Sequence, residues 1–243
     1  MKSSQHADTP AAETEFATLY VAFELGKAKW LVGITVSGSK KLSRHVVAGG
    51  DLEAAWKLIS KAQQKAQQRL GRPVRIVSCY EAGYDGFWLD RRLRELGVEN
   101  RVLDAGSLQV NRRHRRAKTD RLDLENLIQV LIRHEGGEPR VCSVVRPPSV
   151  EHEDARRPSR QRDRLIEERT AHTNRIKGLL HSQGVRELEP RARNFPEKLA
   201  NARTGDGRPL PPFLKQEILD ELERLQVLQR QIDRLEAQAK AER

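Results

Sequence analysis

The chain has 243 residues, with 45 Lys and Arg against 34 Asp and Glu, a formal charge of +11 and a pI near 10.0. This length allows one good-sized domain with an extension, or two small domains. Its two cysteines exclude a disulfide framework and a zinc pattern, and no stretch approaches the roughly 18 apolar residues of a membrane span. We therefore expect a cytoplasmic protein with no membrane contact. The basic excess favours a nucleic-acid partner through its phosphates, although a soluble protein can also be basic without one.

Strand signals dominate the first part of the chain. Residues 1–16 are polar or small and predict a disordered leader. Three apolar or β-branched runs then predict an antiparallel meander, and they cover residues 19–25, 30–36 and 42–48. Asp51 is a suitable N-cap for a helix whose apolar residues recur at helical spacing, and Gly71 is a natural stop.

Strands and helices alternate after Gly71. The predicted elements are a strand at 74–80, a helix at 87–96, a strand at 101–103 and a helix at 120–134. Cys79 lies within an apolar run and is predicted to be a core residue. The element order predicts an α/β domain over residues 17–145, in which helices cover a mixed sheet.

Residues 146–243 lack strand signals and predict a helical extension. A long helix is expected at 160–180, followed by a loop or broken connection at 184–212 that is rich in Gly and Pro. Pro158 is expected to kink this helix or to delay its start to Ser159. His134, His172 and His181 have no ligand partners at metal spacing and are predicted to lie on the surface.

A heptad pattern marks the end of the chain. Apolar residues recur at this spacing, with Glu221 at one seam position, where it should weaken a coiled coil. The seam consists of Leu214, Ile218, Leu225, Leu228, Ile232, Leu235 and Ala239. It can be buried against the 160–180 helix or against another chain, and we expect a helical hairpin that dimerises at high concentration.

Four carboxylates are the candidate catalytic and metal-binding residues. Glu24 and Glu81 each follow an apolar run, and Asp120 and Asp123 lie three residues apart, on one face of a predicted helix. A carboxylate at the end of a buried strand must be desolvated or paired. Several such groups are readily explained if they share one or two Mg²⁺ ions, as in phosphodiester chemistry. The alternative for the Asp pair is helix capping, although Thr119 can serve as the cap instead.

Basic residues flank the Asp pair. They are candidates for contacts with nucleic-acid phosphates, because they would offset the repulsion between the acidic cluster and a phosphate backbone. The candidates are Arg112, Arg113, Arg115, Arg116, Lys118 and Arg121. A second basic set could equally be a solvated face or a nucleic-acid contact, and it comprises Arg156, Arg157, Arg160, Arg162 and Arg164.

Three motifs together carry a resemblance to a known family. They are Phe23-Glu24-Leu25-Gly26-Lys27, Cys79-Tyr80-Glu81-Ala82-Gly83-Tyr84-Asp85-Gly86-Phe87-Trp88 and Lys118-Thr119-Asp120-Arg121-Leu122-Asp123. The chain resembles the amino-terminal domain of the insertion sequence 110 family of transposases, the DEDD transposases, over residues 19–239. The resemblance implies a ribonuclease-H-like (RuvC-like) fold, Mg²⁺ at the four carboxylates, and DNA as substrate together with a structured guide RNA. It also implies an oligomer.

The chain departs from this family at Pro158, which lies inside what the family has as a continuous helix, and at two further places. Glu24 stands where the family has Asp, and its extra methylene moves the carboxylate outward. The family's second domain carries a Gly-rich segment and a serine nucleophile, which have no counterpart after Leu235, so a truncated transposase is expected. The alternative is a non-catalytic nucleic-acid-binding or oligomerisation fragment that associates with a full-length transposase. An actin-like or sugar-kinase ATPase is rejected, because residues 26–29 do not supply the Gly-Thr-type phosphate loop that such a protein needs after its first strand.

Overall fold

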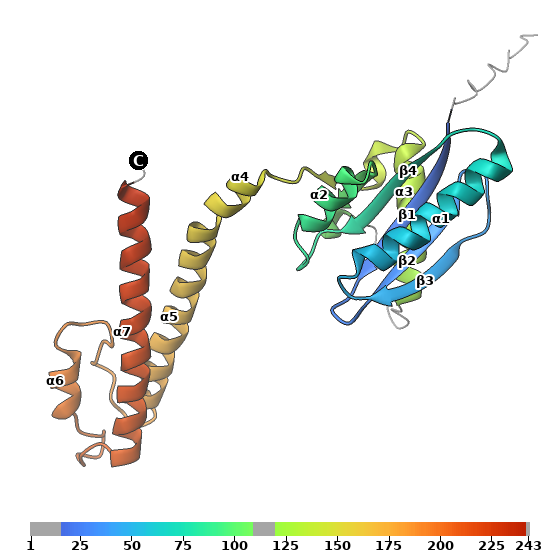
Figure 1. Ribbon diagram of the computed structural model, residues 1–243. Coiled ribbons are helices and arrows are strands. Elements are labelled where there is room, and N and C mark those ends of the chain that lie inside the picture. Colours follow the sequence, from blue (N-terminus) through green and yellow to red (C-terminus); the bar gives the residue numbers. More distant parts are fainter. Residues whose placement is uncertain (1–15, 109–119, 242–243) are drawn as a thin grey trace, which may run out of the picture. The chain divides into compact units, whose positions relative to one another are not determined.

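The computed structural model describes residues 16–108 and 120–241, with the side chains of Asp120 and Arg121 left out (Figure 1). The chain divides into two compact units, of which the first ends at Pro147 and the second begins at Pro148. We call them the α/β unit and the helical unit. This division lies two residues beyond the boundary expected after residue 145. No helix in the described ranges is long and apolar enough to cross a membrane.

A six-stranded mixed sheet forms the centre of the α/β unit. Its strands are β1 (Ala17–Leu25), β2 (Lys29–Val36), β3 (Ser43–Ala48), β4 (Val74–Glu81), β5 (Glu99–Leu103) and β6 (Val144–Val145). Their order across the sheet is β3-β2-β1-β4-β5-β6. β1, β4 and β5 are parallel, whereas β2, β3 and β6 each run antiparallel to a neighbour. The expected α/β class with a mixed sheet and flanking helices is confirmed.

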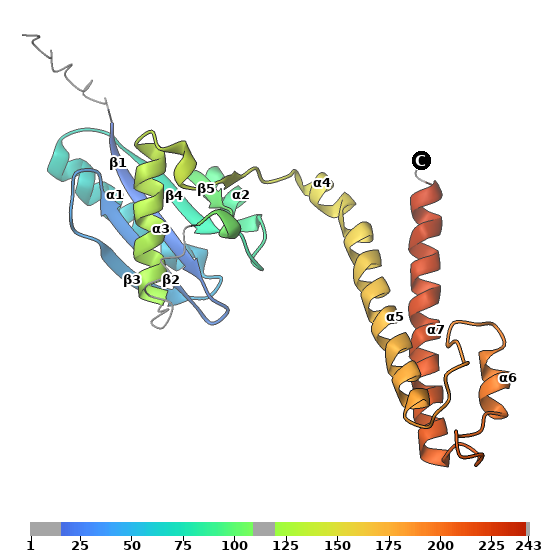
Figure 2. The same ribbon diagram turned by 180° about the vertical axis from the view of Figure 1, so that it is seen from behind.

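Helices cover both faces of this sheet. α1 (Leu52–Leu70) and α2 (Trp88–Glu95) pack on one face, and α3 (Asp120–Glu135) packs on the other, as Figures 1 and 2 show from opposite sides. Two short 3-10 helices, η1 (Ala105–Ser107) and η3 (Pro139–Val141), lie in the connections around α3. Both faces of the central strands are therefore buried, whereas β3 at the sheet edge stays partly exposed, with Val46 at 66%.

Alternation along the strands assigns each residue to one of these faces. In β1, Leu19, Val21 and Phe23 belong to the core under α1 and α2, whereas Ala22 belongs to the core under α3. Cys79 of β4 is fully buried on the α3 side, as predicted for a core residue. Its burial raises the pKa of the Cys79 thiol, which keeps the thiol protonated.

Local signals explain the ends of α1. The Asp51 side chain accepts a hydrogen bond from the Ala54 N–H at 2.9 Å and caps the start of the helix. The helix ends at Gly71, whose φ of 64° lies in the left-handed region that glycine adopts readily. Both were expected from the sequence.

The helical unit contains α4 (Val150–Ala155), α5 (Arg157–His181), α6 (Phe195–Ala200) and α7 (Pro212–Ala241). α5 and α7 lie side by side and bury the apolar seam of α7 between them, except for the exposed Ala239 (Figures 1 and 2). The expected hairpin within one chain is therefore present. Pro158 lies in the first turn of α5, where a backbone N–H has no partner within the helix and its absence costs nothing. The helix therefore begins before Ser159 rather than at it.

The connection between α5 and α7 is packed rather than open. It contains α6, and its side chains Val185, Phe195, Leu199 and Leu210 are buried with residues of α5 and α7. The expected broken connection at residues 184–212 is thus a small cap on the end of the hairpin. Its apolar residues are spaced too irregularly for a periodic pattern to reveal this packing.

The prediction of a surface position is wrong for His134, whose side chain is 22% exposed, and for His172. The His172 ring is mostly buried and contacts the Glu221 carboxylate, which also pairs with Arg175 and Arg224. Glu221 itself is 5% exposed. The contact joins α5 to α7 and cannot be read from spacing along either helix alone.

Candidate active site

The strand register places two of the predicted acids side by side. β1 and β4 are parallel neighbours with Phe23 opposite Tyr80, so the next residues in this register are Glu24 and Glu81. Glu24 pairs with Leu31 and Glu81 with Leu103 on the outer strands, and both partners pack on the α3 side of the sheet. Glu24 and Glu81 therefore belong to one face and one edge of the sheet, at the carboxyl ends of two adjacent strands.

α3 is anchored to the same face one row earlier. In that row Cys79, Ala22 and Gly33 lie opposite one another across β4, β1 and β2. The Cys79 Sγ lies 3.6 Å from the Leu127 carbonyl oxygen. A Cβ on Gly33 would lie 3.1 Å from Leu124, so Gly33 makes room for this helix. Leu124 and Leu127 thus fix where α3 crosses the sheet.

The other end of α3 shows which way the helix runs. Glu135, in its last turn, pairs with Arg75 near the start of β4 at 3.8 Å and with Arg101 at 3.0 Å. α3 therefore runs opposite to β1 and β4. Its first turn, which begins at Asp120, lies toward the edge where Glu24 and Glu81 stand.

Asp123 precedes the anchoring Leu124 and is half-buried, whereas Glu81 is exposed and Glu24 is half-buried. Within the described residues, the side chains of Glu81 and Asp123 have no hydrogen-bond or ion-pair partner. Carboxylates that lack protein partners are suited to holding a hard cation. The Asp120 side chain lies outside the described residues, and the side chains within them form no group of three metal-binding residues.

The predicted phosphate contacts also lie largely outside the described structure. Arg112, Arg113, Arg115, Arg116 and Lys118 fall in residues 109–119. Arg121 is in the first turn of α3, but its side chain is not described. The sequence alone therefore places these cations, between β5 and the start of α3.

The loop that follows Glu81 is held at several points. The Ala82 N–H bonds to the Leu103 carbonyl at 2.8 Å and extends the pairing with β5. The Tyr80 hydroxyl donates to the Gly86 carbonyl at 3.2 Å, and burial of Tyr80 raises its pKa, which keeps this donor protonated. The loop is therefore an ordered part of the site edge.

Sequence reasoning missed a further acid at this edge. Asp104 directly follows β5, and its carboxylate accepts from the Gly106 N–H at 3.2 Å. The same pattern of an acid after an apolar run, used for Glu24 and Glu81, was visible at residues 102–104. Because the Asp104 side chain already caps η1, we assign it a structural role.

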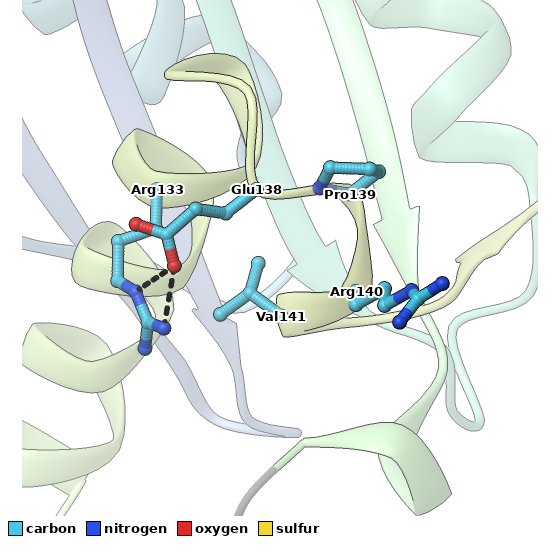
Figure 3. A pocket seen from close by; sticks show the side chains of 5 residues that line it. All are labelled: Arg133, Glu138, Pro139, Arg140 and Val141. Carbon is cyan, nitrogen blue, oxygen red and sulfur yellow. Dashed lines mark hydrogen bonds and ion pairs between the residues drawn. The ribbon is translucent and has the colours of Figure 1, made fainter.

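A shallow pocket lies near the last turn of α3, away from these acids. It is lined by Arg133, Glu138, Pro139, Arg140 and Val141 (Figure 3). Its carboxylate, Glu138, accepts two hydrogen bonds from Arg133, at 2.6 and 2.9 Å. This satisfied pair offers no open ligand position and provides a control for the acids at the other end of the helix.

Comparisons with known proteins point to transposases. The chain is 41% identical to "Putative transposase y4rJ" of Sinorhizobium fredii over 243 residues, which are 99% of this chain and 61% of that protein. It is 28% identical to "Putative transposase y4qE" of the same organism over 173 residues, 71% of this chain and 41% of that protein. The chain thus spans less than two thirds of either relative. No family model and no solved structure matches it.

Proposed function

We propose that this chain is the acidic-site portion of an insertion-sequence transposase and acts on DNA phosphodiesters with Mg²⁺. One observation carries the proposal: Glu24 and Glu81 end adjacent parallel strands on one face, and the first turn of α3 lies toward the same edge. The names of both relatives agree with it, and the similarity to the first extends over 99% of the chain.

The fold assignment within this proposal is ribonuclease-H-like, in the insertion sequence 110 family. Its support is the order of elements: three strands, a helix, a strand, a helix, a strand and a helix. The antiparallel β2, the parallel β4 and β5, and a helix on each face fit that assignment. The packing of α5 against α7 agrees with the helical extension that was expected after the α/β domain.

Each acid has a role in this scheme. Glu24, Glu81, Asp120 and Asp123 would hold one or two Mg²⁺ ions through carboxylate oxygens. Bound there, Mg²⁺ supplies charge stabilisation for the attacking and leaving oxygens of a phosphodiester. Glu24 is the second-to-last residue of β1. Its side chain is one methylene longer than that of Asp and can extend to the end of the strand. That position is compatible with Glu in place of Asp.

The nucleic acid would be held by charge. Arg112, Arg113, Arg115, Arg116 and Lys118, with Arg121, would contact phosphates and offset the repulsion from the acids. A structured guide RNA would be bound by the same chemistry. A homo-oligomer would need a surface other than the α7 seam, because α5 already covers that seam.

The test is Mg²⁺-dependent cleavage of branched and linear DNA by the purified chain. Glu81→Gln and Asp123→Asn should abolish cleavage and weaken Mn²⁺ binding measured by calorimetry, while the unfolding midpoint stays unchanged or rises as like charges are removed. Glu138→Gln, at the opposite end of α3, is the matched control and should cleave normally. Cleavage that survives in both site variants would reject the assignment.

The second candidate is a nucleic-acid-binding or oligomerisation module without chemistry. The observation that favours it is the formal charge of +11, which suits contacts with phosphates whether or not cleavage follows. Under this candidate, the chain binds DNA but does not cleave it, and it inhibits a full-length relative when the two are mixed. DNA binding without Mg²⁺-dependent products, with and without that relative, would establish this candidate over the first.

A further inference from the structure

One aromatic side chain beside the site has no role in the fold. Tyr84 is fully exposed, and it lies three residues after Glu81. Burial of an aromatic ring is among the larger favourable contributions to folding, and Tyr84 makes none. The Tyr84 ring is therefore free to contact a molecule that binds the protein.

The backbone holds Tyr84 at the tip of a tight turn. The Gly86 N–H bonds to the Gly83 carbonyl at 3.3 Å, so Tyr84 and Asp85 are the two central residues. Gly86 has a φ of 64°, which a residue with a side chain rarely adopts. The hydroxyl of the buried Tyr80 donates a hydrogen bond to the Gly86 carbonyl and thereby joins the turn to the core.

The far side of the loop is also anchored. Trp88, which opens α2, packs on Trp30 of β2 with ring centroids 5.9 Å apart. Trp30 in turn meets Phe23 edge-to-face at 6.3 Å. Trp88 is thus engaged within the protein although it is 40% exposed, whereas Tyr84 is fully exposed on a loop that is fixed at both ends.

A single exposed ring is suited to a nucleobase rather than to a protein surface. Protein interfaces use contiguous apolar patches, whereas Tyr84 is flanked by Gly83, Asp85 and Gly86, which offer no such patch. A base needs only an open π face, and every base provides one in return. Stacking on an aromatic side chain requires a base that is unpaired or unstacked from its neighbours.

We propose that Tyr84 stacks on an unpaired base of the DNA bound at the acidic edge, and so positions the strand beside Glu81. This inference rests on the proposed function, since it needs DNA at that edge. Tyr84 acts as a positioning residue and takes no part in the chemistry. It favours single-stranded or branched DNA over a continuous duplex, because only the former presents a base for stacking.

The test compares binding of the full chain to a labelled single strand and to the matching duplex, by fluorescence anisotropy with the metal removed. Tyr84→Ala should weaken binding to the single strand by roughly tenfold, as for loss of one stacked base, and leave duplex binding within about twofold. Tyr84→Phe and Tyr84→Trp should restore single-strand binding. A fluorescent base analogue in the strand should be quenched by the wild-type chain and not by the Ala variant.

Phe213 provides the matched control. It is 91% exposed and lies in the helical unit, so Phe213→Ala removes an exposed ring at a different place and should leave both affinities unchanged. Unchanged single-strand binding by Tyr84→Ala would overturn the stacking proposal and leave the proposed function standing. Equal losses on single strand and duplex, or no rescue by Phe, would also overturn it.

Two further outcomes separate the proposals. A shift in sedimentation on Tyr84→Ala, with DNA binding unchanged, would show that the ring contacts a protein and would reject stacking. Absence of binding to either DNA by the wild-type chain would reject both the stacking and the proposed function.

Discussion

The α/β unit and the helical unit both place a carboxylate next to apolar residues, but they treat it in opposite ways. Glu221 is buried between α5 and α7, and three cationic or hydrogen-bonding side chains surround it: His172, Arg175 and Arg224. Glu81 lies at the end of β4, and no described side chain pairs with it. The first carboxylate is already satisfied by the protein, whereas the second remains available to a ligand.

Pairing within the chain distinguishes structural acids from candidate site acids. A buried charge is tolerated only when it is paired, and Glu221 meets that condition within its own chain. Glu81 and Asp123 have no such partners within the described residues, so pairing inside the chain does not explain them. Glu81 and Asp123 thus belong to the site, and Glu221 belongs to the fold.

The largest expected effect tests how the site is held. Leu124→Ala should destabilise the α/β unit by about 2–5 kcal/mol, because it removes a fully buried side chain and leaves a cavity above Gly33. It should also loosen the first turn of α3 and thereby weaken metal binding. Denaturant unfolding followed by tryptophan fluorescence measures the loss, since all three Trp residues lie in this unit.

Leu122→Ala is the control for this prediction. Leu122 is 40% exposed in the same turn, so its loss should cost about 0.5 kcal/mol or less. Similar costs for the two leucines would contradict the placement of α3 by Leu124.

The buried carboxylate gives the next effect. Glu221→Gln should destabilise the helical unit by about 1.5–3 kcal/mol, because the neutral amide replaces an ionised acceptor of several hydrogen bonds. Glu221→Leu should recover most of that stability, since Arg175 and Arg224 are about half exposed and can turn to water. Hydrogen exchange of α5 and α7 amides in the full chain reports on this unit. A Leu variant less stable than the Gln variant would contradict the argument.

Much of the α/β unit could be predicted from the sequence, because its signals are local. The alternation of apolar residues gave β1, β2, β3 and β4 within a few residues, and Asp51 and Gly71 marked the ends of α1. The antiparallel meander of β1, β2 and β3 was predicted and is confirmed. The placement of β4, β5 and β6 could not be read from local patterns, because it depends on contacts between segments far apart in the chain. β6 has two residues, Val144 and Val145, and is too short for any periodic pattern.

The candidate site was predictable to the extent that it rests on strand ends. The sequence indicated Glu24 and Glu81 as ends of apolar runs, and their neighbouring positions followed only from the β1–β4 register. The His172–Glu221 contact could not be predicted, since it joins two helices across 49 residues. The exposure of Tyr84 could not be predicted either, because an aromatic residue in a motif usually indicates a core position.

Acid should weaken the helical unit through Glu221. Burial opposes ionisation of this carboxyl, but hydrogen bonds from His172 and Arg175 outweigh burial and lower the pKa of Glu221 from its ordinary value of 4.5. A lowered folded-state pKa means that the stabilisation is complete above the unfolded value and is lost as pH falls through the folded value. The protection of α5 and α7 amides should therefore decline below pH 4.5, and Glu221→Leu should flatten that decline. An equally steep decline in the Leu variant would assign the acid sensitivity to other groups.

The smallest effect contrasts the same substitution in the two units. Gly178 lies in α5 with open space where a Cβ would be, so Gly178→Ala should stabilise the helical unit by about 1 kcal/mol through helix propensity. Gly33→Ala should instead destabilise the α/β unit by about 1 kcal/mol or more, because the added Cβ meets Leu124 at 3.1 Å in a packed core. Thermal unfolding of each variant, followed separately in the two units, gives both signs. Stabilisation by both substitutions would mean that α3 does not rest on Gly33, and the first turn of α3 would then no longer be held toward the acidic edge.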